Sequence, residues 1–183
     1  MKTAASLAML GLMLTTAAGA AAQPPATTDA YREQGREELA RKLAERPVEG
    51  KARNIIIFIG DGMGVSTLTA ARIHQGQRQG LDGESYVPAM DRLPYAALVK
   101  TYSHDGQVSD SAPTATAILA GVKTRNGVIG VGPEAAENDC AMGRRHELPS
   151  LFGLAQSMGR ATGIVSTARI THATPAATYA TVA

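Results

Sequence analysis

Residues 54–59 read Asn-Ile-Ile-Ile-Phe-Ile, and residues 60–64 follow directly as Gly-Asp-Gly-Met-Gly. Five consecutive large apolar residues, nearly all β-branched, are typical of a strand that is buried on both faces, as in the middle of a parallel sheet. The glycines that follow end the apolar run abruptly and let the backbone turn. The stretch therefore predicts a central strand with Asp61 at its carboxyl end.

Helix and strand patterns alternate along the rest of the chain. We expect two further strands, at residues 95–102 and 162–166. Helices are expected at residues 29–46, 65–75, 111–119 and 149–158. Such alternation is typical of layered α/β domains. The expected fold class is therefore α/β, a three-layer sandwich with a mostly parallel central sheet flanked by helices.

Composition and charge exclude several classes of function. The chain has 183 residues, enough for about one domain, and is 44% hydrophobic and 19% charged, as in globular proteins. Its 18 Lys and Arg nearly balance 16 Asp and Glu, so the basic stripe of a nucleic-acid-binding protein is not expected. With 4% aromatic residues and no tryptophan, a platform for stacking single-stranded bases is not expected either.

The first residues have the pattern of a secretory signal peptide. Residues 1–22 combine a basic start, an apolar run at 4–14 and small residues that allow cleavage after Ala20 or Ala22. The alternative, a membrane anchor, needs roughly 20 apolar residues, which this run does not reach. We expect the mature segment, residues 23–183, to be exported to the periplasm or the extracellular medium, with no membrane span.

Asp61 is the first candidate functional residue. Ligands of open α/β sheets bind beyond the carboxyl ends of the strands, where the apolar run places this residue. A carboxylate flanked by glycines leaves space for a cation to approach. The alternative is that Asp61 and Gly62 simply form a tight turn, as this dipeptide often does.

Ser111 is the second candidate, because it is expected in the first turn of a helix. Residues 108–116 read Val-Ser-Asp-Ser-Ala-Pro-Thr-Ala-Thr, with Pro113 where the first turn tolerates it. Unpaired N–H groups and the helix dipole make such a position suitable for a phosphate or an oxyanion. The alternative is an ordinary helix cap formed by Asp110 or Ser111.

Together, these motifs and two further segments resemble the alkaline phosphatases. The resemblance extends over almost all of the mature segment, and its blocks occur in the family's order. They are Asn54 to Thr69 (NIIIFIGDGMGVSTLT), Ala89 to Tyr102 (AMDRLPYAALVKTY), Asp110 to Lys123 (DSAPTATAILAGVK) and His172 to Tyr179 (HATPAATY).

The resemblance implies a reaction and a set of metals. The serine of the family's Asp-Ser-Ala motif attacks phosphorus in phosphate monoesters and forms a covalent phosphoserine, which implies this role for Ser111. The family uses two zinc ions and one magnesium ion, a metal clamp suited to in-line displacement. The aspartate of its Gly-Asp-Gly-Met-Gly motif bridges one zinc and the magnesium, which implies this role for Asp61.

Three more residues take roles from the resemblance. Thr174 corresponds to a magnesium ligand, and Asp110 to a residue that orients a phosphate-binding arginine. His172 stands near the magnesium segment, but magnesium prefers oxygen, so His172 either supports the site from outside, favours zinc there, or is an ordinary core histidine. Pro113 departs from the family's commoner glycine or alanine.

The remaining family ligands have no counterpart in residues 1–183. The other zinc ligands, the magnesium glutamate and the phosphate-binding arginine are expected beyond Ala183, as is a disulfide partner for Cys140. We therefore expect the N-terminal part of a longer enzyme that is a homodimer at full length. The alternatives are a phosphodiesterase or sulfatase of the same superfamily, or, if the chain ends at Ala183, a non-catalytic exported protein that binds metal or phosphate.

Overall fold

A computed structural model describes residues 27–46 and 49–183. The predicted signal peptide, residues 1–22, lies outside these residues. The described chain forms two units: residues 27–46 with 65–94, and residues 49–64 with 95–183. No helix in these described parts has the length and apolar character needed to span a bilayer.

The first unit begins with α1 (Thr28–Ala44), which confirms the helix predicted at residues 29–46. The Thr27 hydroxyl accepts a hydrogen bond from the Ala30 amide at 3.1 Å and caps the first turn. Ion pairs one turn apart join Glu33 to Arg36 and Glu38 to Arg41, and such pairs favour the helical state. None of its described residues is buried, so these local interactions are what stabilise α1.

The second helix of this unit, α2 (Val65–Arg78), is also confirmed and is followed by a closely packed turn. Gly76 is buried there, and a Cβ atom at this position would come within 2.8 Å of both the Gly83 Cα and the Tyr86 Cβ. The close approach of Gly83 and Tyr86 to the end of α2 therefore requires a glycine at position 76. The short 3₁₀ helix η1 (Ala89–Arg92) follows and was not predicted.

The central element of the second unit is α3 (Ser111–Ala120), as predicted. The Asp110 carboxylate caps it by accepting a hydrogen bond from the Ala112 amide at 2.7 Å, and Gly121 follows its last residue. Pro113 lies in the first turn, where the missing N–H has no intrahelical partner to lose. The start of α3 is therefore fixed by its local sequence.

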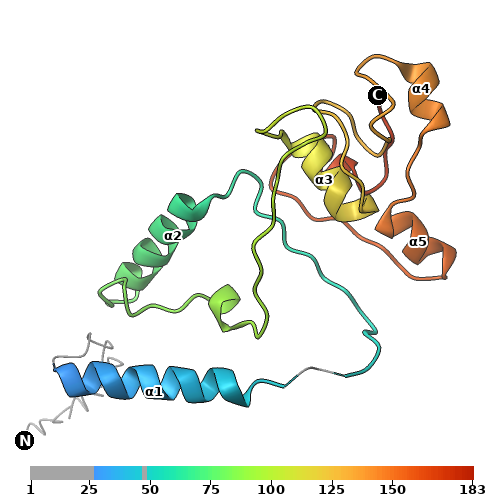
Figure 1. Ribbon diagram of the computed structural model, residues 1–183. Coiled ribbons are helices and arrows are strands. Elements are labelled where there is room, and N and C mark those ends of the chain that lie inside the picture. Colours follow the sequence, from blue (N-terminus) through green and yellow to red (C-terminus); the bar gives the residue numbers. More distant parts are fainter. Residues whose placement is uncertain (1–26, 47–48) are drawn as a thin grey trace, which may run out of the picture. The chain divides into compact units, whose positions relative to one another are not determined.

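Two short helices pack against α3, namely α5 (Leu151–Ser157) and α6 (Ala173–Ala176). Figure 1 shows α5 beside α3. The shared core is built from buried Ala115, Leu119 and Ala177, with Ile129 and Phe152 packed against it. The small side chains on α3 let its neighbours approach closely.

A second apolar cluster lies in the loop that follows α3. Its buried members are Val128, Val131 and Ala135, with Met142 and Ala183 against them. Met142 belongs to α4 (Cys140–Arg145), a helix that was not predicted. Isolated antiparallel bridges pair Ile129 with Val182 and Val131 with Glu147, so the end of the chain is joined to this loop.

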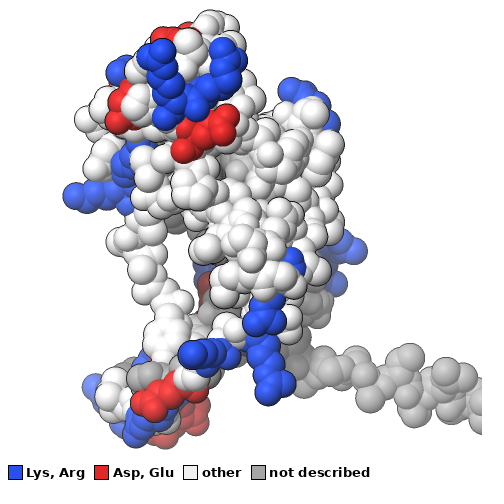
Figure 2. Space-filling view, turned by 90° about the vertical axis from the view of Figure 1, so that its right-hand side faces the viewer, with Lys and Arg blue, Asp and Glu red and all other residues white. Residues whose placement is uncertain are grey.

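The predicted sheet is not present in the described residues. The segments 54–59, 95–102 and 162–166 lack strand pairing in residues 27–46 and 49–183, so this part of the chain does not contain the expected parallel sheet. Most of their side chains are exposed, with Phe58 93%, Leu98 104% and Val165 102% accessible. Most of the surface in view in Figure 2 is uncharged. An apolar run becomes a central strand only when neighbouring strands supply its hydrogen bonds, and the described residues do not pair these three with one another.

Candidate active site

Three of the predicted site residues meet at the carboxylate of Asp61. The Ser111 hydroxyl donates to Asp61 Oδ1 at 2.8 Å, and the Thr174 hydroxyl donates to Asp61 Oδ2 at 2.7 Å. These partners are 50 and 113 residues away in the sequence, so the contacts depend on the tertiary fold. All three residues belong to the second unit.

The two hydroxyls set the charge state of the Asp61 carboxylate. The hydrogen bond from Thr174, followed by that from Ser111, lowers the pKa of Asp61 below its ordinary value, and His172 adds to this effect, while desolvation opposes it. Asp61 therefore stays ionised at neutral pH. A carboxylate in this state is suited to hold a cation or to orient a hydroxyl.

His172 lies at the edge of the same cluster. Its Nδ1 is 3.5 Å from Asp61 Oδ2, and this nitrogen is buried without a hydrogen-bond partner. His172 is also the residue that precedes α6, which begins one residue before Thr174. A buried ring nitrogen without a partner is unusual and needs an explanation. The 3.5 Å distance places the His172 ring beside Asp61.

Local structure presents Asp61 and Ser111 to each other. Asp61 lies in a tight turn in which the Met63 amide donates to the Gly60 carbonyl at 3.2 Å, so the turn considered as the alternative is present together with the cluster. Ser111 is the first residue of α3 and is half-buried. Its side chain therefore stands at the positive end of a helix, where a negative group is stabilised.

The carboxylate of Asp110 bonds to backbone N–H groups and not to Asp61, Ser111 or Thr174. One oxygen caps α3, and the other accepts a hydrogen bond from the Gly127 amide at 2.8 Å. The helix cap that was considered as the alternative is therefore present, and Asp110 forms it. Both oxygens of Asp110 thus bind backbone N–H groups, which hold the residue before Ser111 in place.

Asp105 and Asn126 make further contacts around Asp110 that were not predicted. The Asn126 amide donates to Asp105 Oδ1 at 2.9 Å, and the Asp110 amide donates to Asn126 Oδ1 at 3.4 Å. The Asn126-Gly127 dipeptide is a common turn signal, so the sequence could have indicated a turn there. The dipeptide carries no indication that the turn contacts Asp110.

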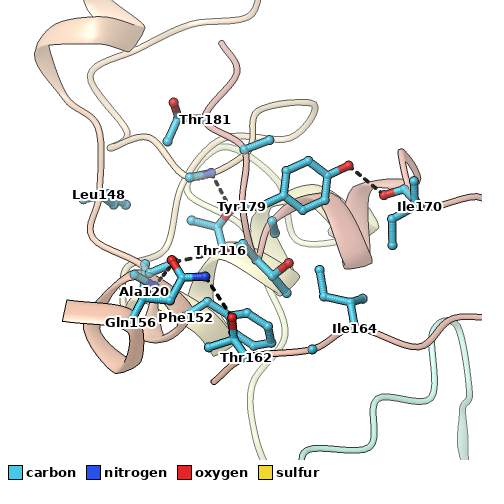
Figure 3. Close-up of a pocket in the computed structure, with 17 residues that line it drawn as sticks. Thr116, Ala120, Leu148, Phe152, Gln156, Thr162, Ile164, Ile170, Tyr179 and Thr181 are labelled. Atoms are coloured by element: carbon cyan, nitrogen blue, oxygen red, sulfur yellow. Dashed lines mark hydrogen bonds between the residues drawn. The ribbon is translucent and has the colours of Figure 1, made fainter. Parts of the chain in front are cut away.

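A cavity of about 510 Å³ lies elsewhere in the second unit. Figure 3 shows it between Thr116 and Ala120 of α3, Phe152 and Gln156 of α5, and the chain around Tyr179. None of the five predicted site residues lines it. Its polar side chains are engaged in hydrogen bonds, as in the bond from Gln156 to Thr162. The cavity is therefore separate from the Asp61 cluster.

Comparison with known proteins identifies the family. Residues 52–183 match the alkaline phosphatase family. The chain belongs to this family. It is 47% identical over 151 residues to the tissue-nonspecific alkaline phosphatase of Gallus gallus, with 82% of this chain and 29% of that protein aligned. An alkaline phosphatase of Gadus morhua is 48% identical over 132 residues, and the tissue-nonspecific isozyme of Homo sapiens is 44% identical over 151.

The chain spans about 29% of the length of these alkaline phosphatases. Among solved structures, the alkaline phosphatase of the Antarctic bacterium TAB5 matches 54% of this chain with a TM-score of 0.46 and 34% sequence identity, covering 26% of that structure. Membership thus rests on the sequence matches.

The donor atoms of the cluster fit part of a metal site of the alkaline phosphatase type. Asp61 and the hydroxyls of Ser111 and Thr174 offer oxygen atoms of the kind that magnesium prefers. The unpartnered Nδ1 of His172 adds a nitrogen within reach of the same carboxylate. No group of three or more His, Cys, Asp or Glu side chains comes together in residues 27–46 and 49–183. The described residues therefore provide oxygen donors but not a full zinc ligand set.

Proposed function

We propose that Asp61, Ser111 and Thr174 are part of the active site of a phosphomonoesterase, in the protein at the full length of its alkaline phosphatase relatives. The observation that carries this proposal is the 2.8 Å hydrogen bond from Ser111 Oγ to Asp61 Oδ1 at the start of α3. A hydroxyl is a weak nucleophile unless a neighbouring group or a metal activates it. The ionised carboxylate and the helix terminus supply part of that activation.

The reaction assigned to Ser111 takes place in two steps. In the first, the Ser111 hydroxyl loses its proton and its oxygen bonds to phosphorus while the bond to the alcohol oxygen breaks, and the alcohol leaves with one proton. In the second, water loses a proton and bonds to phosphorus, the bond to the Ser111 oxygen breaks, Ser111 regains a proton, and inorganic phosphate leaves. Asp61 holds the Ser111 hydroxyl by its hydrogen, which fixes the direction of the oxygen lone pairs.

Two zinc ions and one magnesium ion are the cofactors assigned to this reaction. When bound, they supply positive charge that favours the serine alkoxide and the charge on the transferring phosphoryl group. Asp61 would hold these ions through its carboxylate, and Ser111 and Thr174 would hold them through their hydroxyl oxygens. The remaining ligands are assigned to residues outside this chain.

His172 is assigned a supporting role rather than a bond to magnesium. Magnesium prefers oxygen ligands, and the His172 Nδ1 is 3.5 Å from the Asp61 carboxylate. A ring in this position can orient Asp61. Asp110 is assigned to orient a phosphate-binding arginine, an assignment that follows the family and that adds to its cap of α3.

The test compares Ser111→Ala with a matched control in the full-length protein. Ser109→Ala is the control, because Ser109 is a neighbouring serine whose hydroxyl bonds only to the Asp110 carbonyl in the described contacts, at 3.1 Å. With zinc and magnesium present, Ser111→Ala should lower kcat on p-nitrophenyl phosphate by at least about 10³-fold, while Ser109→Ala should stay within about twofold.

The same assay separates the alternatives. Faster turnover of a diester or a sulfate ester than of the monoester would indicate a phosphodiesterase or a sulfatase. Near wild-type turnover by Ser111→Ala would contradict the role of Ser111. No hydrolysis of any ester by the metal-loaded wild-type protein would favour the non-catalytic alternative.

A further inference from the structure

The segment that leads into Ser111 is tied to a second loop by a set of hydrogen bonds. Residues 103–110 precede α3, and residues 124–127 follow its end. Five hydrogen bonds of 2.8 to 3.4 Å join the two segments: His104 N to Thr124 O, Asn126 N to Asp105 Oδ1, Asn126 Nδ2 to Val108 O, Asp110 N to Asn126 Oδ1, and Gly127 N to Asp110 Oδ2.

Asn126 makes three of these five bonds. Its amide side chain is bidentate: Nδ2 donates to the Val108 carbonyl at 3.2 Å, and Oδ1 accepts from the Asp110 amide at 3.4 Å. Its backbone N–H donates to Asp105 Oδ1 at 2.9 Å. A single side chain therefore fixes the backbone on both sides of Ser109, immediately before Ser111.

Gly127 extends this set to the cap of α3. Its φ of +80° is a conformation that side-chain-bearing residues rarely adopt, and its N–H donates to Asp110 Oδ2 at 2.8 Å. A Cβ atom there would also come within 3.3 Å of the Glu137 carboxylate carbon. The other oxygen of Asp110 is the cap of α3. Asp110 is thus held between the loop and the helix.

The loop that carries Asn126 is itself fixed to the core. Thr124 and Val128, on either side of it, are both 0% exposed. Val128 belongs to the buried cluster with Val131 and Ala135. Packed interiors deform little, so a loop anchored on both sides provides a rigid reference for the start of α3.

We propose that Asn126, held by Asp105, is a positioning residue for Ser111 and acts through the backbone of residues 108–110. The proposal rests on the proposed function of Ser111 as nucleophile. A nucleophile must be held close to its productive position, and a misplacement of about 1 Å can cost about 100-fold in rate. We call the contact of Asp105 with Asn126, together with the bonds of Asn126 to Val108 and Asp110, the Asp105–Asn126 clamp. This clamp holds the backbone before Ser111, whereas Asp61 holds the Ser111 hydroxyl.

The first test is Asn126→Ala in the full-length, metal-loaded protein. We expect kcat on p-nitrophenyl phosphate to fall about 10- to 100-fold, with KM changed less than about threefold, since substrate-binding groups are left in place. Thr114→Ala is the matched control. The Thr114 hydroxyl also bonds to Asp110, at its carbonyl and at 2.8 Å, but from within α3. Its removal should leave kcat within about twofold.

A second pair of variants covers the case in which Asn126→Ala does not fold. Asp105 is exposed, so its replacement leaves the core intact. Asp105→Ala removes the acceptor of the Asn126 amide, whereas Asp105→Asn retains an oxygen that can accept the same hydrogen bond. The proposal expects a reduced kcat for Asp105→Ala and its recovery in Asp105→Asn. A kcat of Asp105→Ala equal to that of the wild-type protein would overturn the proposal.

A crystal structure of the Asn126→Ala protein provides a readout that does not depend on activity. The proposal expects the Ser111 Oγ to move away from Asp61 Oδ1, so that the 2.8 Å contact is lost. An unchanged contact, with kcat within twofold of wild type, would overturn the proposal. Turnover by Ser111→Ala would contradict the proposed function. Even then, the position of Ser111 in the crystal structure of Asn126→Ala shows whether Asn126 positions Ser111.

Discussion

Asp61 accepts hydrogen bonds from Ser111 and Thr174 through different oxygens of one carboxylate, and the contact with Ser111 is 2.8 Å long. Because each oxygen has its own donor, the carboxylate cannot turn without breaking a bond. Asp61 therefore fixes the two hydroxyls relative to each other. This arrangement is what distinguishes the cluster from an Asp-Gly turn and a helix cap that merely occur in the same chain.

Replacement of Asp61 by asparagine tests the need for a carboxylate. The amide replaces one of the two acceptor oxygens by an NH2 donor, so one hydroxyl loses its acceptor at that atom, and the amide carries no charge to attract a cation. We expect kcat/KM on p-nitrophenyl phosphate to fall at least about 100-fold, together with a loss of bound zinc and magnesium. Metal content is measured by inductively coupled plasma mass spectrometry. A variant with full metal content and unchanged kcat/KM would show that the charge of Asp61 is not needed.

Thr174 can be tested by a pair of variants that separates its hydroxyl from its shape. Thr174→Val keeps the shape but loses the hydrogen bond to Asp61 Oδ2, whereas Thr174→Ser keeps a hydroxyl. We expect Thr174→Val to lower magnesium affinity about 10- to 100-fold and Thr174→Ser to stay within about threefold. Magnesium titration of metal-depleted protein measures both. Equal affinities for the two variants would rule out a role for the hydroxyl.

The core of the second unit contains a polar contact whose loss should lower stability. The buried Thr116 hydroxyl accepts from the Gly130 amide at 3.0 Å and donates to the Ala112 carbonyl at 2.9 Å. Thr116→Val leaves the buried Gly130 N–H without an acceptor, so the free energy of unfolding should fall by about 1–3 kcal/mol. Urea unfolding of the full-length protein gives this value, with Thr116→Ser, which keeps the hydroxyl, as control. A valine variant as stable as the serine variant would contradict the assignment.

The hydrogen bond from Asn126 to Asp105 should also affect the acid titration of the Asp105 carboxylate. The backbone hydrogen bond from Asn126 lowers the pKa of Asp105 below its ordinary value, and the Ser103 hydroxyl and nearby Arg125 add smaller effects in the same direction. A depressed folded-state pKa means that the stabilisation is fully present above the unfolded value, about 3.9, and is lost as the pH falls through the folded value. A carbon-13 carboxyl titration by NMR should therefore show Asp105 titrating below 3.9. A midpoint at or above the ordinary value would contradict the hydrogen bond.

Helices were predictable from the sequence to the extent that local signals define them. Asp110 and Gly121 mark the two ends of α3, and the structure agrees because caps act within a few residues. The apolar pattern of residues 54–59 predicted a strand, but the described residues do not pair this segment with a neighbouring strand. Pairing depends on distant neighbours, which no local pattern specifies.

The candidate site was predictable in part for the same reason. Asp61 and Ser111 stand out because a strand-like run and a helix start place them at ligand-binding positions. Thr174 has no such signal, and the resemblance to the family suggested it. Asn126 could not be found in this way, because an Asn-Gly turn indicates only where the chain bends and not what the turn contacts.

The most direct test of the account is to identify the residue that carries phosphate during turnover. Full-length protein loaded with zinc and magnesium is mixed with a phosphate monoester, quenched in acid and digested, and the phosphorylated peptide is sequenced by mass spectrometry. The account predicts one phosphoryl group on Ser111, and none in the Ser111→Ala protein. A phosphoryl group on another residue, or turnover that persists when Ser111 is alanine, would contradict it.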